Sequence, residues 1–180
     1  MRFPIKISLA LSVMNIAASP TKHPSARDVI TTLNLAPNPE KGYFRQTFAD
    51  STNANNRYYS TATYYLLEGS VGASYWHHVD AAEVWHYYAG APLLLQTSWN
   101  NRTATQKRIS GSDVFRGQKP QLVIQKWEWQ SARSLGEWTL VGTTVAPGFV
   151  ESGYEIVVEG WEPVGESLPK GENSSGRWDR

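Results

Sequence analysis

The sequence predicts an all-β protein, an antiparallel sandwich or barrel, with one short helix before the strands. Short runs rich in aromatic and β-branched residues follow one another along the chain, as strands of such folds do. These runs cover residues 43–48, 58–67, 83–88, 92–99, 121–125 and 138–145. Turns bearing Gly, Asn and Pro separate them, and no long helical pattern interrupts them. Together these observations favour a fold in which strands build the core.

The short helix is predicted just ahead of the first strand. Ser25 is a favourable N-cap residue, and the acidic Asp28 stands three positions later. The apolar positions of the helical pattern are Val29, Ile30, Leu33 and Leu35. Pro37 ends the pattern, because proline cannot continue a helix.

Composition indicates a single domain over residues 24–160. The chain has 180 residues, of which 41% are hydrophobic and 18% charged, so a core of useful size can form. The net charge of +1 gives no electrostatic footprint for nucleic acid. Thiol chemistry is excluded because the sequence contains no cysteine.

The two ends of the chain differ from the middle. A short basic start followed by an apolar run predicts a secretory signal peptide over residues 1–18 and a secreted protein. The run is shorter than the ~20 apolar residues that a membrane span needs. Residues 161–180, rich in Gly, Ser, Glu and Pro, are predicted to form a disordered tail.

Residues 74–90 are the strongest candidate for a functional site. The segment places three histidines and two carboxylates among aromatic residues that favour strands. Such polar groups are costly to bury unless they bind a ligand or pair with each other. In a regular strand, Glu83, Trp85 and Tyr87 share one face, while His86 lies on the other. We therefore expect His86 to serve packing or a dimer surface.

The spacing of this segment resembles the first sequence motif of the cupin barrels. That motif has a Gly, then a His pair, a Glu, six residues and a closing Gly. The corresponding residues here are Gly72, His77, His78, Glu83 and Gly90.

Five ordered blocks over roughly residues 27–160 resemble one branch, the cupin 5 family, formerly a domain of unknown function. They are residues 38–45, 60–67, 74–90, 129–133 and 138–149. The resemblance implies a double-stranded β-helix, the cupin jelly-roll barrel, with a pocket at one mouth. It also implies a homodimer, but no particular reaction.

Metal binding fits this chain less well than it fits many cupins. The candidate ligands are His77, His78, Glu83 and Gln130, and either alignment of the His pair retains one of the two motif histidines. Gln130 stands where other cupins supply a further His, and it is a weak neutral ligand. The family usually has Arg at position 78 and Pro-Ala-Gly at 125–127, where this chain has Gln-Lys-Trp. We expect no cofactor, with a divalent metal as the alternative.

Without a metal, the same residues suit proton transfer and small-molecule binding. His77 beside Glu83 can form a base with an orienting carboxylate, and these two are the predicted catalytic residues. Arg45 can clamp a ligand carboxylate or enolate. The other predicted ligand-binding residues are Tyr64, His78, Trp85, Tyr87, Trp129 and Gln130.

Three classes of function follow from these residues. The first is a non-redox isomerase, epimerase or cyclase that acts on a carbonyl-bearing metabolite of secondary metabolism. The second is a ligand-binding cupin without turnover. The third is a metal-dependent oxygenase, which needs bound iron or a similar ion.

Overall fold

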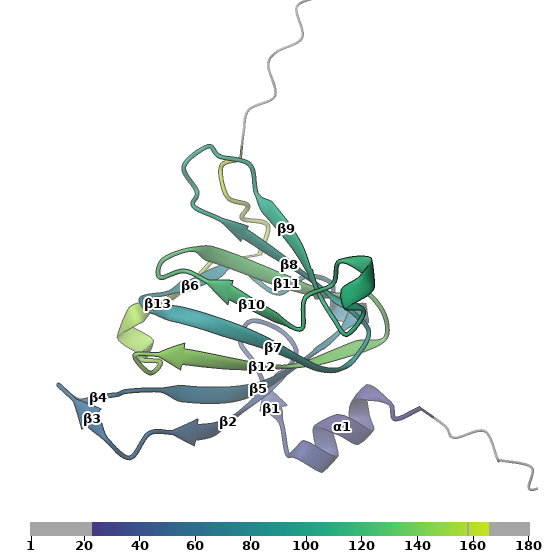
Figure 1. Ribbon diagram of the computed structural model, residues 1–180, viewed down its shortest axis with the longest axis horizontal. Coiled ribbons are helices and arrows are strands. Elements are labelled where there is room, and N and C mark those ends of the chain that lie inside the picture. Colours follow the sequence, from purple (N-terminus) through teal and green to yellow (C-terminus); the bar gives the residue numbers. More distant parts are fainter. Residues whose placement is uncertain (1–22, 158, 166–180) are drawn as a thin grey trace, which may run out of the picture.

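The computed structural model describes residues 23–157 and 159–165. The predicted signal peptide therefore lies outside the described residues, as does the tail from residue 166 onward. Two antiparallel sheets face each other, with one short helix beside them (Figure 1). The predicted all-β class with a short N-terminal helix is confirmed.

The larger sheet has six strands, and it carries most of the strands predicted from the sequence. In spatial order it contains β1 (Ala36–Pro37), β2 (Tyr43–Ala49), β5 (Thr61–Glu68), β12 (Trp138–Ala146), β7 (Ala82–Gly90) and β10 (Gln121–Ile124). The long strand β12 pairs with both β5 and β7, which places these three strands at the centre of the sheet.

The second sheet has five strands. In spatial order it contains β13 (Tyr154–Ile156), β6 (His77–Val79), β11 (Trp129–Ser134), β8 (Leu93–Ser98) and β9 (Gln106–Ser110). A separate hairpin joins β3 (Asn53–Ala54) to β4 (Arg57–Tyr58). The described residues also form three single 3₁₀ turns: η1 (Gly69–Val71), η2 (Val114–Arg116) and η3 (Glu151–Gly153).

The helix α1 (Ala26–Leu33) forms where the sequence predicts it. Ser25 and Asp28 form a capping box, in which each side chain bonds to the other residue's backbone N–H. Asn34 ends the helix in the left-handed conformation, before Pro37 is reached. Among the described residues, no helix has the length and apolar character needed to cross a membrane. The apolar side of α1 covers Leu66 and Leu140 on the outer face of the larger sheet.

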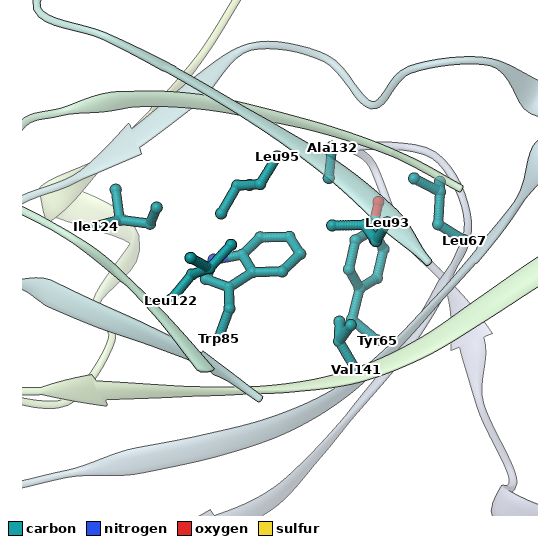
Figure 2. Packing of buried hydrophobic residues seen from close by; sticks show 9 residues of the cluster. All are labelled: Tyr65, Leu67, Trp85, Leu93, Leu95, Leu122, Ile124, Ala132 and Val141. Atoms are coloured by element: carbon teal, nitrogen blue, oxygen red, sulfur yellow. The ribbon is translucent and has the colours of Figure 1, made fainter. Parts of the chain in front are cut away.

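The main hydrophobic core lies between the two sheets. Its buried members are Tyr65, Leu67, Trp85, Leu93, Leu95, Leu122, Ile124, Ala132 and Val141. Figure 2 shows the ring of Trp85 among Leu95, Leu122 and Ile124, with Tyr65 beside it. The rings of Tyr65 and Trp85 meet edge to face with centroids 5.9 Å apart. This packing fixes Trp85, and through it the inner face of β7.

The sequence pattern missed β1 and β3, which have two residues each, and also β6, β9, β11 and β13. The strand β9 is a sheet edge with few apolar residues, and β6 and β13 have three residues each, too short for a period to be seen. The strand β11 carries Gln, Ser, Ala and Arg between its ends, without the β-branched residues that mark a strand. Its pairing with both β6 and β8 holds it in the sheet despite this composition.

Trp161 and Glu162, at the start of the predicted tail, make contacts with the second sheet. Trp161 packs against Trp129 with ring centroids 4.7 Å apart and against Trp76 at 6.4 Å. Glu162 accepts a hydrogen bond from the Trp76 Nε1 at 2.9 Å. These contacts place Trp161 and Glu162 on the outer face of the second sheet.

We expect Trp161→Ala to lower the free energy of unfolding by about 2 kcal/mol, because it removes two aromatic contacts and exposes Trp129. Urea unfolding followed by tryptophan fluorescence measures the change. Phe115→Ala is the control, since Phe115 is 99% exposed and its loss should change stability by less than ~0.5 kcal/mol. Equal effects of the two substitutions would contradict a stabilising role for this segment.

Candidate functional site

A cavity of about 460 Å³ opens at one end of the barrel, with walls from both sheets. Its lining residues are Asn38, Pro39, Glu40, Phe44, Gln46, Thr61, Thr63, Tyr65, His77, Val79, Glu83, Trp85, Thr143, Val145, Phe149, Glu151 and Tyr154. The lining combines an aromatic wall with a few ionisable groups. That combination is typical of small-molecule sites.

Glu83 lies on the inner face of β7 and is only 7% exposed. The amide Nε2 of Gln130, from β11 in the opposite sheet, donates a hydrogen bond to Glu83 Oε2 at 2.5 Å. The indole Nε1 of Trp85 donates to the Gln130 Oε1 at 2.9 Å, which fixes the orientation of the amide. Burial raises the pKa of the Glu83 carboxyl, and this effect outweighs the opposing influence of His77 and Gln130. The raised pKa makes Glu83 better suited to donate a proton than an exposed carboxyl would be.

His77 lies in the cavity wall that the second sheet forms. It is on β6, directly opposite Gln130 of β11. Its Nδ1 is 3.1 Å from the carbonyl oxygen of Tyr75, an acceptor that places the ring proton on Nδ1. The other nitrogen, Nε2, then has a free lone pair, and it lies 3.6 Å from Glu40 Oε2. His77 can therefore accept a proton at Nε2. The carboxylate beside its Nε2 is that of Glu40, whereas the sequence suggested Glu83 for this role.

Glu40 and Tyr154 are site residues that the sequence analysis did not identify. Glu40 enters the cavity from the turn after β1, where Gly42 has φ +71° and an added Cβ would lie 2.3 Å from the Leu66 carbonyl oxygen. The hydroxyl of Tyr154 donates to Glu40 Oε1 at 2.9 Å. Burial, with the Glu40 charge, raises the pKa of Tyr154, so its phenol stays protonated as this donor. The Asn-Pro-Glu-Lys-Gly turn at 38–42 was the sequence feature from which Glu40 could have been identified as a site residue.

The second histidine of the pair faces away from the cavity. The His78 Nε2 lies 3.1 Å from Glu155 Oε2, and its ring packs edge-on against Trp129 at 4.1 Å and Trp127 at 5.1 Å. Burial lowers the pKa of His78, and the Glu155 carboxylate opposes this shift. Trp127 keeps a positive φ of 65°, at the position where the family pattern has glycine. His78 and Trp129 therefore lie on the outer face of the second sheet.

The remaining predicted ligand-binding residues also lie outside the cavity lining, apart from Trp85. Arg45 is exposed on β2, directly opposite Tyr64 of β5, and both belong to the outer face of the larger sheet. Tyr64 packs edge-on against Tyr88 at 5.9 Å. Tyr87 lies beyond Trp85 on β7, and its hydroxyl donates to the Gly90 carbonyl at 2.6 Å. Since Arg45 lies outside the cavity lining, its predicted role as a clamp for a ligand in this cavity has no geometric support.

His86 lies on the outer face of the larger sheet, as strand alternation predicts. Its Nε2 is 3.3 Å from the Thr144 Oγ1 on the neighbouring strand β12. It takes no part in the cavity lining.

The four predicted metal ligands do not come together as a metal site. His78 points to the opposite face of its sheet from His77, and both polar atoms of the Gln130 amide are used by Glu83 and Trp85. Within residues 23–157 and 159–165, no group of three or more acidic or histidine side chains has the arrangement needed to hold a metal ion. The residues present do not fit the metal centre found in many cupins, and we derive no step through a metal.

The buried Glu83 carboxyl predicts a pH-dependent effect of its removal. Its pKa in the folded protein lies above the ordinary value of 4.5, so unfolding releases a proton at intermediate pH. The stability that this group contributes is complete below that ordinary value and falls as pH rises through the folded pKa. We expect Glu83→Gln to gain stability relative to the wild type as the pH is raised from about 4.5 to neutral pH. Urea unfolding of both proteins across this range tests the expectation.

The exposed Glu137→Gln serves as the control for this series, because Glu137 lies in the turn between β11 and β12 at the far end of the barrel. The difference in the free energy of unfolding between Glu137→Gln and the wild type should change little with pH. A flat pH profile for Glu83→Gln as well would contradict a raised pKa of Glu83.

Two facing antiparallel sheets with a His and a Glu in the wall of an end cavity define a protein of the cupin class. Within that class, the chain belongs to the cupin 5 family. The sequence profile of this family, described as Cupin superfamily (DUF985), matches residues 27–157. Among curated proteins, no sequence matches the chain.

Solved structures support the same fold. A hypothetical protein from Leishmania major has 24% identity and a TM-score of 0.69, over 74% of this chain and 88% of that one. A protein from Shewanella oneidensis has 26% identity and a TM-score of 0.70, over 75% and 85% of the two chains. Oxalate decarboxylase from Bacillus subtilis has 14% identity and a TM-score of 0.52, over 69% of this chain and 30% of that one. At that identity the likeness to oxalate decarboxylase shows the fold alone.

Proposed function

We propose that this cupin is a non-redox enzyme, an isomerase, epimerase or cyclase, that moves protons next to a carbonyl group of a small metabolite. The observation that carries the proposal is that one cavity is lined by His77, whose Nε2 can accept a proton, and by Glu83, whose carboxyl has a raised pKa. A site that holds one group able to accept a proton and another able to donate one is suited to acid–base catalysis near neutral pH.

The proposed step uses only these two groups. The His77 Nε2 takes the proton from the carbon next to the carbonyl, and the electron pair of that C–H bond forms the C=C bond of an enol. Glu83 gives its proton to the carbonyl oxygen in the same step, so the intermediate is neutral. The His77 imidazolium then gives its proton to a carbon of the enol, the same one or another, while the enol hydroxyl returns its proton to Glu83. This restores the C=O bond, neutral His77 and protonated Glu83, and gives the isomer.

The neighbouring residues orient both groups. Glu40 stabilises the imidazolium that forms on His77, while its other oxygen is held by Tyr154. Gln130 stabilises the Glu83 carboxylate that remains after proton donation. The aromatic wall excludes water from the enol and provides apolar contact to the ligand.

Deuterium exchange tests the proposal even while the substrate is unidentified. The purified protein is incubated in heavy water with a panel of carbonyl metabolites, and proton NMR follows loss of signal at the carbon next to the carbonyl. We expect faster exchange for at least one compound that also binds. Binding of panel members with no exchange in any would overturn the enzyme proposal.

A second candidate is a cupin that binds a ligand without turnover. One observation favours it: Gln130 donates to Glu83, and Trp85 donates to Gln130. These buried groups therefore have hydrogen-bond partners without any reaction, as in a purely structural network. Binding without exchange would support it. The third candidate, a metal-dependent oxygenase, needs a donor set that the described residues do not supply. Metal content of untagged protein, purified without chelator, tests that class.

The proposal includes the cellular context read from the sequence. The apolar leader at residues 1–18 supports entry to the secretory pathway, and amino-terminal sequencing of the mature protein tests its removal. The family resemblance supports a homodimer, which light scattering measures.

A further inference from the structure

The cavity is lined by more acidic side chains than basic ones. Three of them are acidic, Glu40, Glu83 and Glu151, and the basic one is His77. Neither Lys nor Arg occurs among the described residues of the lining. A cavity of this composition has no fixed positive charge to neutralise a ligand carboxylate or phosphate.

The cations on neighbouring segments are engaged elsewhere. Arg57 forms two hydrogen bonds to Asp80, at 2.8 and 2.7 Å, and a third to the Gly148 carbonyl at 2.6 Å. Lys41 lies 3.8 Å from Glu159 and 4.6 Å from the centre of the Tyr75 ring. Their charges are therefore compensated outside the cavity.

Any positive charge that His77 acquires is also balanced within the site. Its Nε2 lies 3.6 Å from Glu40 Oε2, so a protonated His77 forms an ion pair with Glu40. Glu151, in contrast, has no basic side chain beside it in the cavity lining. This residue is exposed on η3, lines the cavity and makes no ion pair among the described residues.

We propose that the cavity selects a small carbonyl compound that carries a protonated amine, and rejects compounds that carry a carboxylate or phosphate instead. The carbonyl part of this inference rests on the proposed function, whereas the preference for positive charge rests on the cavity itself. It replaces the expectation that Arg45 binds an acidic ligand group, because Arg45 lies on the outer face of the sheet.

The depth of the lining residues orients such a ligand. Glu83 and Trp85 are 7% and 2% exposed, and they form the inner end, where a carbonyl group meets the proton donor. Glu151 and Phe149 lie at the mouth, where an ammonium group keeps part of its hydration. Phe149 packs edge-on against Tyr154 at 5.5 Å, so aromatic rings near Glu151 can also contact the cation.

The test compares three compounds of similar size that differ in charge: phenethylamine, phenethyl alcohol and hydrocinnamate. Isothermal titration calorimetry of the full chain at low salt gives the three dissociation constants. We expect phenethylamine to bind about tenfold more tightly than the alcohol, and hydrocinnamate more weakly than both. Added salt should reduce the preference for the amine, because salt screens the exposed Glu151.

A matched pair of variants separates the local effect from the net charge of the protein. Glu151→Gln should reduce the preference for the amine over the alcohol by about three- to fivefold. Glu137→Gln removes the same charge from the turn between β11 and β12 and should leave the preference unchanged.

Equal or tighter binding of hydrocinnamate would overturn the inference, as would absence of binding by all three compounds. An amine preference that survives Glu151→Gln would overturn the role of Glu151. Amine binding in a protein that exchanges no protons of any carbonyl compound would leave the charge preference standing and remove the proposed enzyme function.

Discussion

Replacing His77 by alanine is expected to slow deuterium exchange by about 10²- to 10⁴-fold, the usual effect of removing a general base. The side chain is 3% exposed, yet it lines a cavity and does not belong to the main core cluster. Its loss enlarges the cavity and leaves the packing between the sheets intact. We therefore expect the far-ultraviolet circular dichroism of the variant to match the wild type while exchange is lost.

His86→Ala is the matched control for this experiment. His86 lies on β7, three residues from Glu83, but on the outer face, where it contacts Thr144. Its removal should leave exchange within about twofold of the wild type. Unchanged exchange in the folded His77 variant would exclude His77 as the base, and equal losses in both variants would point to a general structural effect.

The control follows from strand alternation, which is where prediction from the sequence was most successful. A period of two over residues 83–88 separates Glu83 and Trp85 from His86, and the structure places them on opposite faces of the sheet. Alternation needs only local geometry, so one strand is enough to apply it. The helix cap at Ser25 is equally local, and it was predicted for the same reason.

Contacts between segments that are distant in the sequence were harder to predict. Glu40 lies 37 residues before His77 in the chain, and the contact between them depends on a turn closed by Gly42. Tyr154 reaches the site from a strand of three residues, too short for its pattern to be recognised. Tyr64 was assigned to the cavity on residue type, but its position on β5 turns it to the outer face. Residue type suggests a role, whereas the face of the strand decides it.

The histidine pair shows the same limit within two adjacent residues. Successive residues in a strand point to opposite faces, so His77 and His78 cannot both enter the cavity from β6. The sequence analysis assigned both to the site, without deciding which of them faces inward. The pairing of His77 with Gln130, whose side chain reaches Glu83, settles that question.

Trp85→Ala is expected to lower the free energy of unfolding by about 3–5 kcal/mol, the largest effect on stability that we predict. Trp85 is 2% exposed in the centre of the main core, and its side chain packs between the two sheets (Figure 2). The substitution also leaves Gln130 Oε1 without the donor that it has in the wild type, in a residue with 0% exposure. Both losses add to the cost, and urea unfolding measures their sum.

Two further variants divide this cost between packing and hydrogen bonding. Trp85→Phe keeps much of the ring contact but loses the Nε1 donor, so we expect a smaller loss of about 1–3 kcal/mol. Trp99→Ala removes the same side chain from a site that is 49% exposed and should cost less than ~1 kcal/mol. If Trp85→Phe proved as unstable as Trp85→Ala, the hydrogen bond to Gln130 would account for most of the stabilisation. Because that bond also orients the amide that contacts Glu83, the same variant should lower deuterium exchange even where the barrel remains folded.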